Sequence, residues 1–148
     1  MRLITTDLLK FGTILLGFTL LVLSCQEENM ANDPLKIAVI GLTHTHVHWI
    51  FESEKRGDIE IVGIVESNRA LAERYGEQHS YDLGMVYANH EALIESASFE
   101  AVAAFGSIYE HLEVVQTYAP LGKHIMVEKP LAVSLEHALE MDSLARAN

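Results

Sequence analysis

Residues 36–41, KIAVIG, decide the fold, because four consecutive apolar residues run directly into a glycine. A second run of the same kind, IEIVGIV, occupies residues 59–65. Short runs that are almost entirely apolar are typical of parallel strands buried on both faces of a sheet. Between the two runs, apolar residues recur at helical spacing over residues 46–55. The sequence therefore predicts a strand, a helix and a second strand.

The same alternation continues outward from this unit to the end of the chain. Further strands are predicted at residues 85–87, 101–105 and 124–128, and further helices at 69–75, 90–95, 107–118 and from 134 onward. Residues typical of helix ends flank these predicted helices. The predicted N-terminal caps are Asn68, Asn89, Ser107 with Glu110, and Ser134, and Gly76 is predicted to end its helix. The last helix has a mostly apolar face of Leu135, Ala138, Leu139, Asp142 and Leu144. Five strands joined by helices predict a doubly wound parallel α/β sheet, in which ligands bind beyond the carboxyl ends of the strands.

Composition limits the classes of partner. The chain has 148 residues, and 21 acidic against 10 basic residues give a formal net charge of −11. We therefore expect no nucleic-acid partner, since binding to a phosphate backbone needs a basic face. With 49% hydrophobic residues the chain can fill a core, and its single cysteine excludes an intrachain disulfide or a multi-cysteine metal site.

The first 24 residues are predicted to be a signal peptide. Residues 11–23, FGTILLGFTLLVL, are an uncharged run that is too short to span a bilayer and that follows Arg2 and Lys10. The run ends in Val-Leu-Ser-Cys, which resembles the bacterial lipobox and makes Cys25 the candidate lipidation site.

We expect Cys25 to begin a polar tether over residues 25–34, followed by a folded domain over residues 35–148. This organisation predicts an exported lipoprotein, anchored in the membrane and facing the periplasm or the cell surface. In the alternative interpretation, translation starts at Met30 and the protein is cytoplasmic.

The turn after the first strand is a candidate phosphate site. Residues 41–46, GLTHTH, occupy the position of the dinucleotide fingerprint G-x-G-x-x-G but keep only its first glycine. Thr43 and His46 place side chains where the fingerprint has its other glycines. A helix N-terminus still offers N–H groups to an anion, so a phosphate could be held here with Thr43, Thr45 or a histidine as additional donors.

The second strand ends at Glu66, which lies 25 residues after Gly41. That offset is close to the ~20 residues typical of the carboxylate that binds the adenosine ribose. Ser67 and Arg69 could instead accommodate a 2′-phosphate, so the choice between NAD and NADP is open at this point.

Three histidines, His44, His46 and His48, raise the possibility of a metal site. Neither a carboxylate nor a cysteine stands nearby in the sequence to complete a ligand set. We therefore predict no metal site and interpret these histidines as polar residues at the start of a helix.

The tripeptide Glu128-Lys129-Pro130 follows the fifth strand. A lysine at this strand end can orient a substrate hydroxyl or carbonyl beside a nicotinamide ring and modulate the accompanying proton transfer. Lys129 is therefore the candidate catalytic residue. The alternative interpretation is a surface lysine paired with Glu128.

Three segments together resemble the Gfo/Idh/MocA oxidoreductases: KIAVIG at 36–41, IVESNRALAERYG at 64–76 and HLEVVQTYAPLGKHIMVEKPLA at 111–132. The resemblance covers residues 35–148. It implies a Rossmann-like nucleotide-binding domain of an enzyme that moves a hydride between a sugar or polyol and NAD or NADP.

The resemblance also implies roles for particular residues. Gly41, Thr43, His44 and His46 would face the pyrophosphate, Glu66 the adenosine ribose, Ser107 and His111 the nicotinamide side, and Glu128 and Lys129 the active site. We expect weak cofactor binding, because Thr43 and His46 crowd the turn.

Family members continue with an α+β substrate domain, which we expect this chain to lack. The resemblance therefore implies an inactive fragment whose fifth strand is an exposed sheet edge prone to self-association. The alternative function is a non-catalytic surface lipoprotein that uses the same scaffold to bind a carbohydrate or a partner.

Overall fold

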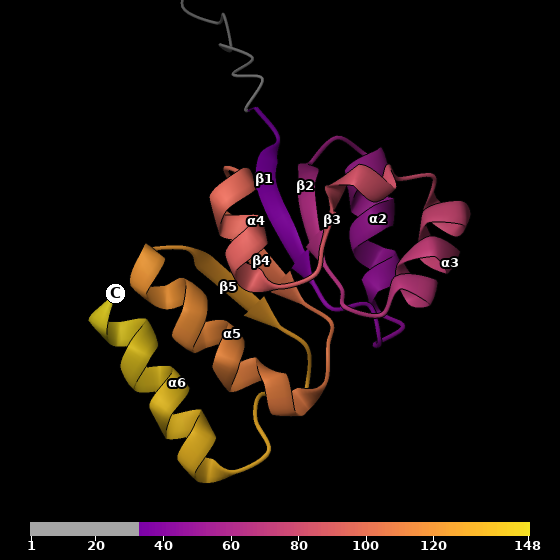
Figure 1. Ribbon diagram of the computed structural model, residues 1–148. Helices are drawn as coiled ribbons and strands as arrows, with labels where there is room; N and C mark the ends of the chain where they lie inside the picture. Colours follow the sequence, from indigo (N-terminus) through magenta and orange to yellow (C-terminus); the bar gives the residue numbers. More distant parts are fainter. Residues whose placement is uncertain (1–32) are drawn as a thin grey trace, which may run out of the picture. The chain divides into compact units, whose positions relative to one another are not determined.

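The computed structural model describes residues 33–148, and the predicted signal peptide, Cys25 and most of the tether lie outside the described residues (Figure 1). One parallel sheet has the strand order β3-β2-β1-β4-β5. Its strands are β1 (Leu35–Ile40), β2 (Ile59–Val65), β3 (Val86–Tyr87), β4 (Ala101–Ala104) and β5 (His124–Val127). Each agrees with its predicted range to within one residue, so the predicted doubly wound fold class is confirmed.

Five α-helices accompany the strands: α2 (Val47–Lys55), α3 (Arg69–His79), α4 (His90–Ser96), α5 (His111–Tyr118) and α6 (Leu135–Ala147). Three short 3₁₀ turns join them: η1 (Leu83–Met85), η2 (Ile108–Glu110) and η3 (Ala119–Leu121). The caps at Asn68, Asn89 and Ser134 accept backbone N–H groups as predicted, and Ser107 forms its capping box with Glu110 at the start of η2 rather than of a continuous α-helix.

The two faces of the sheet are covered by different helices, because successive side chains of a strand point to opposite faces. Ile37 and Val39 of β1 belong to the core that contains residues of α2 and α3. Ala38 and Ile40 belong to the core that contains residues of α4 and α5. The strand order reverses between β1 and β4, so a ligand crevice is expected where the loops after these two strands part.

Two details of the predicted helices are wrong. Helix α3 continues through Gly76 to His79, and its C-cap Ser80 has a left-handed φ of 64°. Gly76 serves packing instead, since a Cβ there would lie 3.1 Å from a methyl group of Leu83. Helix α6 buries Met141, whereas Leu135 and Leu139 of its predicted apolar face are 75% and 61% exposed. Within residues 33–148, no helix has the length and apolar character needed to cross a membrane.

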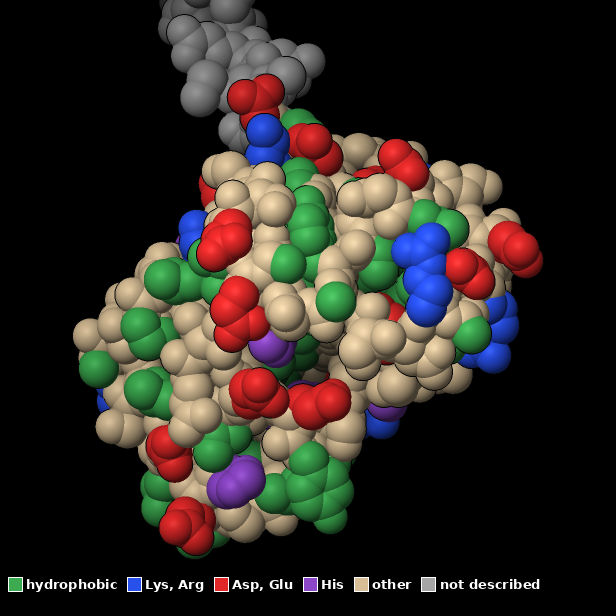
Figure 2. Space-filling view, viewed as in Figure 1, with side chains coloured by type: hydrophobic (Ala, Val, Ile, Leu, Met, Phe, Trp, Pro, Cys, Tyr) green, Lys and Arg blue, Asp and Glu red, His purple; other side chains and the backbone are tan. Residues whose placement is uncertain are grey.

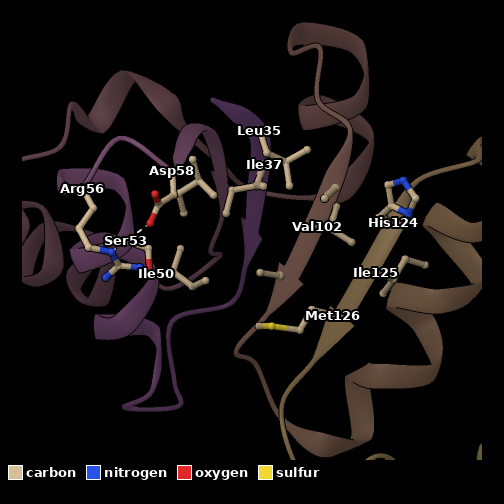
Figure 3. A pocket seen from close by; sticks show the side chains of 13 residues that line it. Leu35, Ile37, Ile50, Ser53, Arg56, Asp58, Val102, His124, Ile125 and Met126 are labelled. Carbon is tan, nitrogen blue, oxygen red and sulfur yellow. Dashed lines mark hydrogen bonds and ion pairs between the residues drawn. The ribbon is translucent and has the colours of Figure 1, made fainter. Parts of the chain in front are cut away.

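The face of the sheet covered by α2 and α3 leaves an apolar groove of about 370 Å³ near β4 and β5. Figure 3 shows it between Ile37 and Ile50 on one side and Met126 of β5 on the other. Strand β5 forms an edge of the sheet, and Met126 is 45% exposed. The predicted self-association through this edge stays a prediction.

Candidate functional site

Two glycines bring the loops after β1 and β4 into contact at the carboxyl end of the sheet. Gly41 has a φ of +76°, and a Cβ on it would lie 2.6 Å from the Cα of Gly106. Only a glycine fits this contact, because a side chain would be strained by the φ and would overlap the neighbouring backbone. Gly106 was not among the predicted site residues, although a glycine directly after a strand was a signal for it.

The turn from Gly41 to α2 is held against its neighbours by its own polar groups. The N–H of His44 donates to the carbonyl of Phe105 at 2.8 Å, and the hydroxyl of Thr43 donates to the same carbonyl at 3.3 Å. The N–H groups of Thr43 and Thr45 have no acceptor among the described residues. These two groups are therefore the amides that this turn can offer to an anion.

Glu66 ties this turn to the start of α3. Its carboxylate accepts the N–H of Leu42 at 2.9 Å and the N–H of Asn68 at 2.8 Å. The side chain therefore stands at the strand end where a ribose carboxylate is expected. Arg69, the suggested partner of a 2′-phosphate, pairs instead with Glu73 on the surface of α3 at 2.8 Å.

A cavity of about 270 Å³ lies on the Glu66 side of the Gly41–Gly106 contact. Three of its lining residues are acidic: Glu66, Glu110 and Glu113. Neither a lysine nor an arginine is among the described residues that line it. Figure 2 shows acidic side chains gathered around a hollow on one face of the molecule. The cavity is therefore suited to a neutral, hydroxyl-bearing group rather than to a phosphate.

A second cavity, of about 350 Å³, collects most of the other predicted site residues. They come from the segments that follow β1, β4 and β5, including the start of α5, and are Thr43, His44, Ser107, His111, Glu128 and Lys129, together with Gly106, Ile108 and Pro130. Lys129 is exposed, whereas Glu128 leaves only 11% of its side chain accessible. The candidate catalytic lysine thus borders a cavity at the carboxyl end of the sheet.

His111 contributes a buried acceptor to this cavity. The residue is 2% exposed, and its Nδ1 donates to the carbonyl of Leu131 at 3.0 Å, so in the neutral ring Nε2 is the acceptor. Nε2 is buried and has no partner among the described residues. A buried acceptor without a partner is costly, so a ligand that donates a hydrogen bond would satisfy it.

The fold brings Glu128 to the histidines of the turn, 82 residues away in sequence. His46 Nδ1 lies 2.8 Å from Glu128 Oε2, and His44 Nδ1 lies 4.0 Å from the same oxygen. This corrects the sequence argument that no carboxylate is available to these histidines. Burial favours the neutral form of Glu128, but hydrogen bonds from the Lys129 N–H and His46 outweigh it, so the pKa of Glu128 lies below its ordinary value.

His48 stands apart from this cluster. Its Nδ1 lies 2.7 Å from Nε2 of His79, and its ring stacks on Tyr75. Burial lowers the pKa of His79, with a further contribution from His48 and Lys55 that Glu52 opposes.

The sequence profile of an oxidoreductase family with an NAD-binding Rossmann fold, Gfo/Idh/MocA, matches residues 35–148. The chain belongs to this family. Residues 35–148 are therefore a Gfo/Idh/MocA nucleotide-binding domain, as the sequence resemblance implied.

Curated relatives of this Gfo/Idh/MocA chain include sugar and polyol dehydrogenases. A D-glucoside 3-dehydrogenase of Escherichia coli K12 is 30% identical over 126 residues, covering 81% of this chain and 34% of the relative. A scyllo-inositol 2-dehydrogenase (NADP(+)) of Bacillus subtilis is 28% identical over 117 residues, covering 77% and 34%. The chain thus spans about a third of the length of these relatives.

A solved structure shares the same fold. An oxidoreductase of Agrobacterium radiobacter in complex with NAD+, L-tartaric acid and magnesium matches with a TM-score of 0.68 at 22% identity. The match covers 76% of this chain and 32% of that one.

Proposed function

We propose that residues 35–148 bind NAD in preference to NADP and form the nucleotide-binding domain of an enzyme that oxidises or reduces a sugar or polyol. The acidic cavity beside Gly41 is the observation that carries this proposal. The printed names of the D-glucoside and scyllo-inositol dehydrogenases support the substrate class.

The preference for NAD follows from charge. The 2′-phosphate that distinguishes NADP would enter a cavity bordered by Glu66, Glu110 and Glu113. Carboxylates repel a phosphate at short range, whereas a carboxylate readily accepts a hydrogen bond from a ribose hydroxyl. Glu66 keeps lone pairs for this purpose, because each of its oxygens accepts only one backbone N–H.

The cavity on the other side of the Gly41–Gly106 contact fits the nicotinamide end. The orphan Nε2 of His111 is an acceptor for a donor such as a carboxamide N–H. When bound, the nicotinamide supplies the hydride donor or acceptor. Lys129 binds and orients the substrate oxygen and stabilises the charge that develops on it as the proton moves.

We further propose that turnover needs a second domain that binds the substrate, because Lys129 borders the second cavity and is exposed to solvent. The predicted export and lipidation at Cys25 belong to the same proposal. Their support is the sequence alone: a charged start, an apolar run over residues 11–23 and the Val-Leu-Ser-Cys end.

Dinucleotide binding can be measured through Trp49, which is the single tryptophan of the chain. Its ring stacks on His46 in the turn after β1, with ring centroids 3.9 Å apart. Titration of its fluorescence with NAD and NADP should give tighter binding of NAD. Glu66→Gln should reduce that preference, whereas Glu77→Gln, at an exposed position of α3, should leave it unchanged.

Equal binding of NAD and NADP, or stronger binding of NADP, would contradict the assignment of the acidic cavity to the ribose. If neither dinucleotide binds, the non-catalytic binding module becomes the better explanation of this fold.

A further inference from the structure

The contact of His44 and His46 with Glu128 has the composition of a metal site. The candidate ligand atoms of these three residues lie within 4.8 Å of one another. They form the one group of this kind among the described residues. All three side chains are partly buried, with exposed fractions of 32%, 26% and 11%. We propose that His44, His46 and Glu128 bind one Zn²⁺ ion, with an open fourth position.

The present separations are close to those that zinc requires. Zn²⁺ lies about 2.0–2.2 Å from histidine nitrogens and carboxylate oxygens, so two ligands of a tetrahedral ion are about 3.3 Å apart. Glu128 Oε2 lies 2.8 Å from His46 Nδ1 and 4.0 Å from His44 Nδ1. The distance to His46 is shorter than the separation of about 3.3 Å, and the distance to His44 is longer, each by less than 1 Å. Small rotations of side chains would therefore create the site without a change of backbone.

Hydrogen bonds aim the atoms of the cluster at one another. His46 Nδ1 donates to Glu128 Oε2 at 2.8 Å, and Zn²⁺ would take the place of the proton between them. His44 Nδ1 accepts the N–H of His46 at 3.2 Å, so its lone pair points into the cluster, and Zn²⁺ would replace this long hydrogen bond. Glu128 Oε1 accepts the N–H of Lys129 at 2.9 Å, which leaves Oε2 directed at the histidines. Trp49 stacks on the His46 ring and holds its orientation. Such supporting contacts orient metal ligands and are costly to remove.

Two imidazoles and one carboxylate form a ligand set that is typical of zinc sites with catalytic rather than structural roles. Such sites hold water or substrate in the remaining position. His44 and Glu128 line the cavity of about 350 Å³ that Lys129 also borders. The open position of the ion therefore faces a space that can admit a water or an oxygen-bearing ligand.

The test is a titration of the 148-residue chain, kept in mild detergent and freed of metal, with Zn²⁺ in competition with a chromophoric chelator. We expect one Zn²⁺ per chain. His44→Gln, His46→Gln and Glu128→Gln should each weaken binding by at least about tenfold, since even supporting residues contribute that much. His124→Gln and Glu136→Gln, which change residues of the same types outside the cluster, should leave the affinity unchanged.

Cobalt gives an independent readout, because Co²⁺ in a four-coordinate site absorbs visible light much more strongly than hydrated Co²⁺. The wild type and both control variants should show this absorption, and the three cluster variants should lose it. Circular dichroism identifies any variant that fails to fold. His44→Gln changes the most exposed ring of the three and is decisive if the other two variants are unfolded.

The proposal is overturned if the wild type binds no Zn²⁺, if all three cluster variants bind as tightly as the wild type, or if a control variant loses binding. These titrations contain no nucleotide. Their outcome is therefore independent of the preference for NAD, which depends on Glu66.

Discussion

Replacement of Gly41 by alanine tests whether the meeting of two loops organises the candidate site. Gly41 has a φ of +76°, and its Cβ would lie 2.6 Å from Gly106 Cα and 2.7 Å from Gly106 N. Gly57 is a matched control, since it has a φ of +81° but a Cβ there would have nothing within 4 Å. Both substitutions impose the same backbone strain, and only one of them adds an overlap.

The expected magnitudes follow from this difference. A left-handed conformation costs an alanine about 1–2 kcal/mol, and the stiffer unfolded chain returns about 0.4–1 kcal/mol. Gly57→Ala should therefore lower the free energy of unfolding by about 1 kcal/mol. Gly41→Ala must also move one backbone away from the other, and overpacking of this kind costs about 1–3 kcal/mol. Its total loss is then about 2–4 kcal/mol.

Urea unfolding, followed by circular dichroism and by the fluorescence of Trp49, measures both variants against the wild type. With an m-value of about 2 kcal/mol per M, Gly41→Ala should lower the midpoint by about 1–2 M, and Gly57→Ala by about 0.5 M. Equal losses in the two variants would refute the reasoning, because the contact with Gly106 would then contribute nothing.

Four further predictions concern other parts of the chain. Burial and an adjacent imidazole lower the pKa of His79 below 6.5, so the His79 ring binds a proton more readily in the unfolded chain than in the folded one. The melting temperature should therefore fall as the pH drops below about 6.5, and it should fall less in His79→Gln. Expressed with its leader in a bacterium, the protein should partition into detergent and Cys25→Ser should not; an unprocessed product that starts at Met30 would contradict lipidation. The 148-residue chain should show no turnover of sugars or polyols, because substrate would be held on one side only and the proximity contribution of roughly 7–11 kcal/mol would be lost. In a protein that joins this domain to a substrate domain, Lys129→Ala should lower kcat far more than it lowers affinity for the dinucleotide. A normal kcat in that variant would show that Lys129 is not catalytic. Met126→Lys should reduce any concentration-dependent association seen by light scattering, since a charge on an edge strand opposes pairing; unchanged association would place the contact elsewhere.

The sequence alone determined the order and type of the elements and the family. The strands are short, mainly apolar runs, and the caps of α3, α4 and α6 are side chains that accept a backbone N–H within a few residues. Such features are local, so Asn68, Asn89 and Ser134 could be identified as caps without knowledge of their neighbours. The Glu128-Lys129-Pro130 tripeptide after β5 could likewise be identified from the sequence.

Contacts between distant segments were decided only by the tertiary structure. Nothing near Gly41 in the sequence indicates Gly106, and nothing near His46 indicates Glu128, yet the parallel sheet brings the ends of β1, β4 and β5 side by side. Periodicity was also unable to show which residues of α6 face α5, because Met141 is buried while Leu135 remains exposed. The chemistry of the site arises where strand ends meet, and their meeting depends on the order of strands in space, which local sequence patterns do not encode.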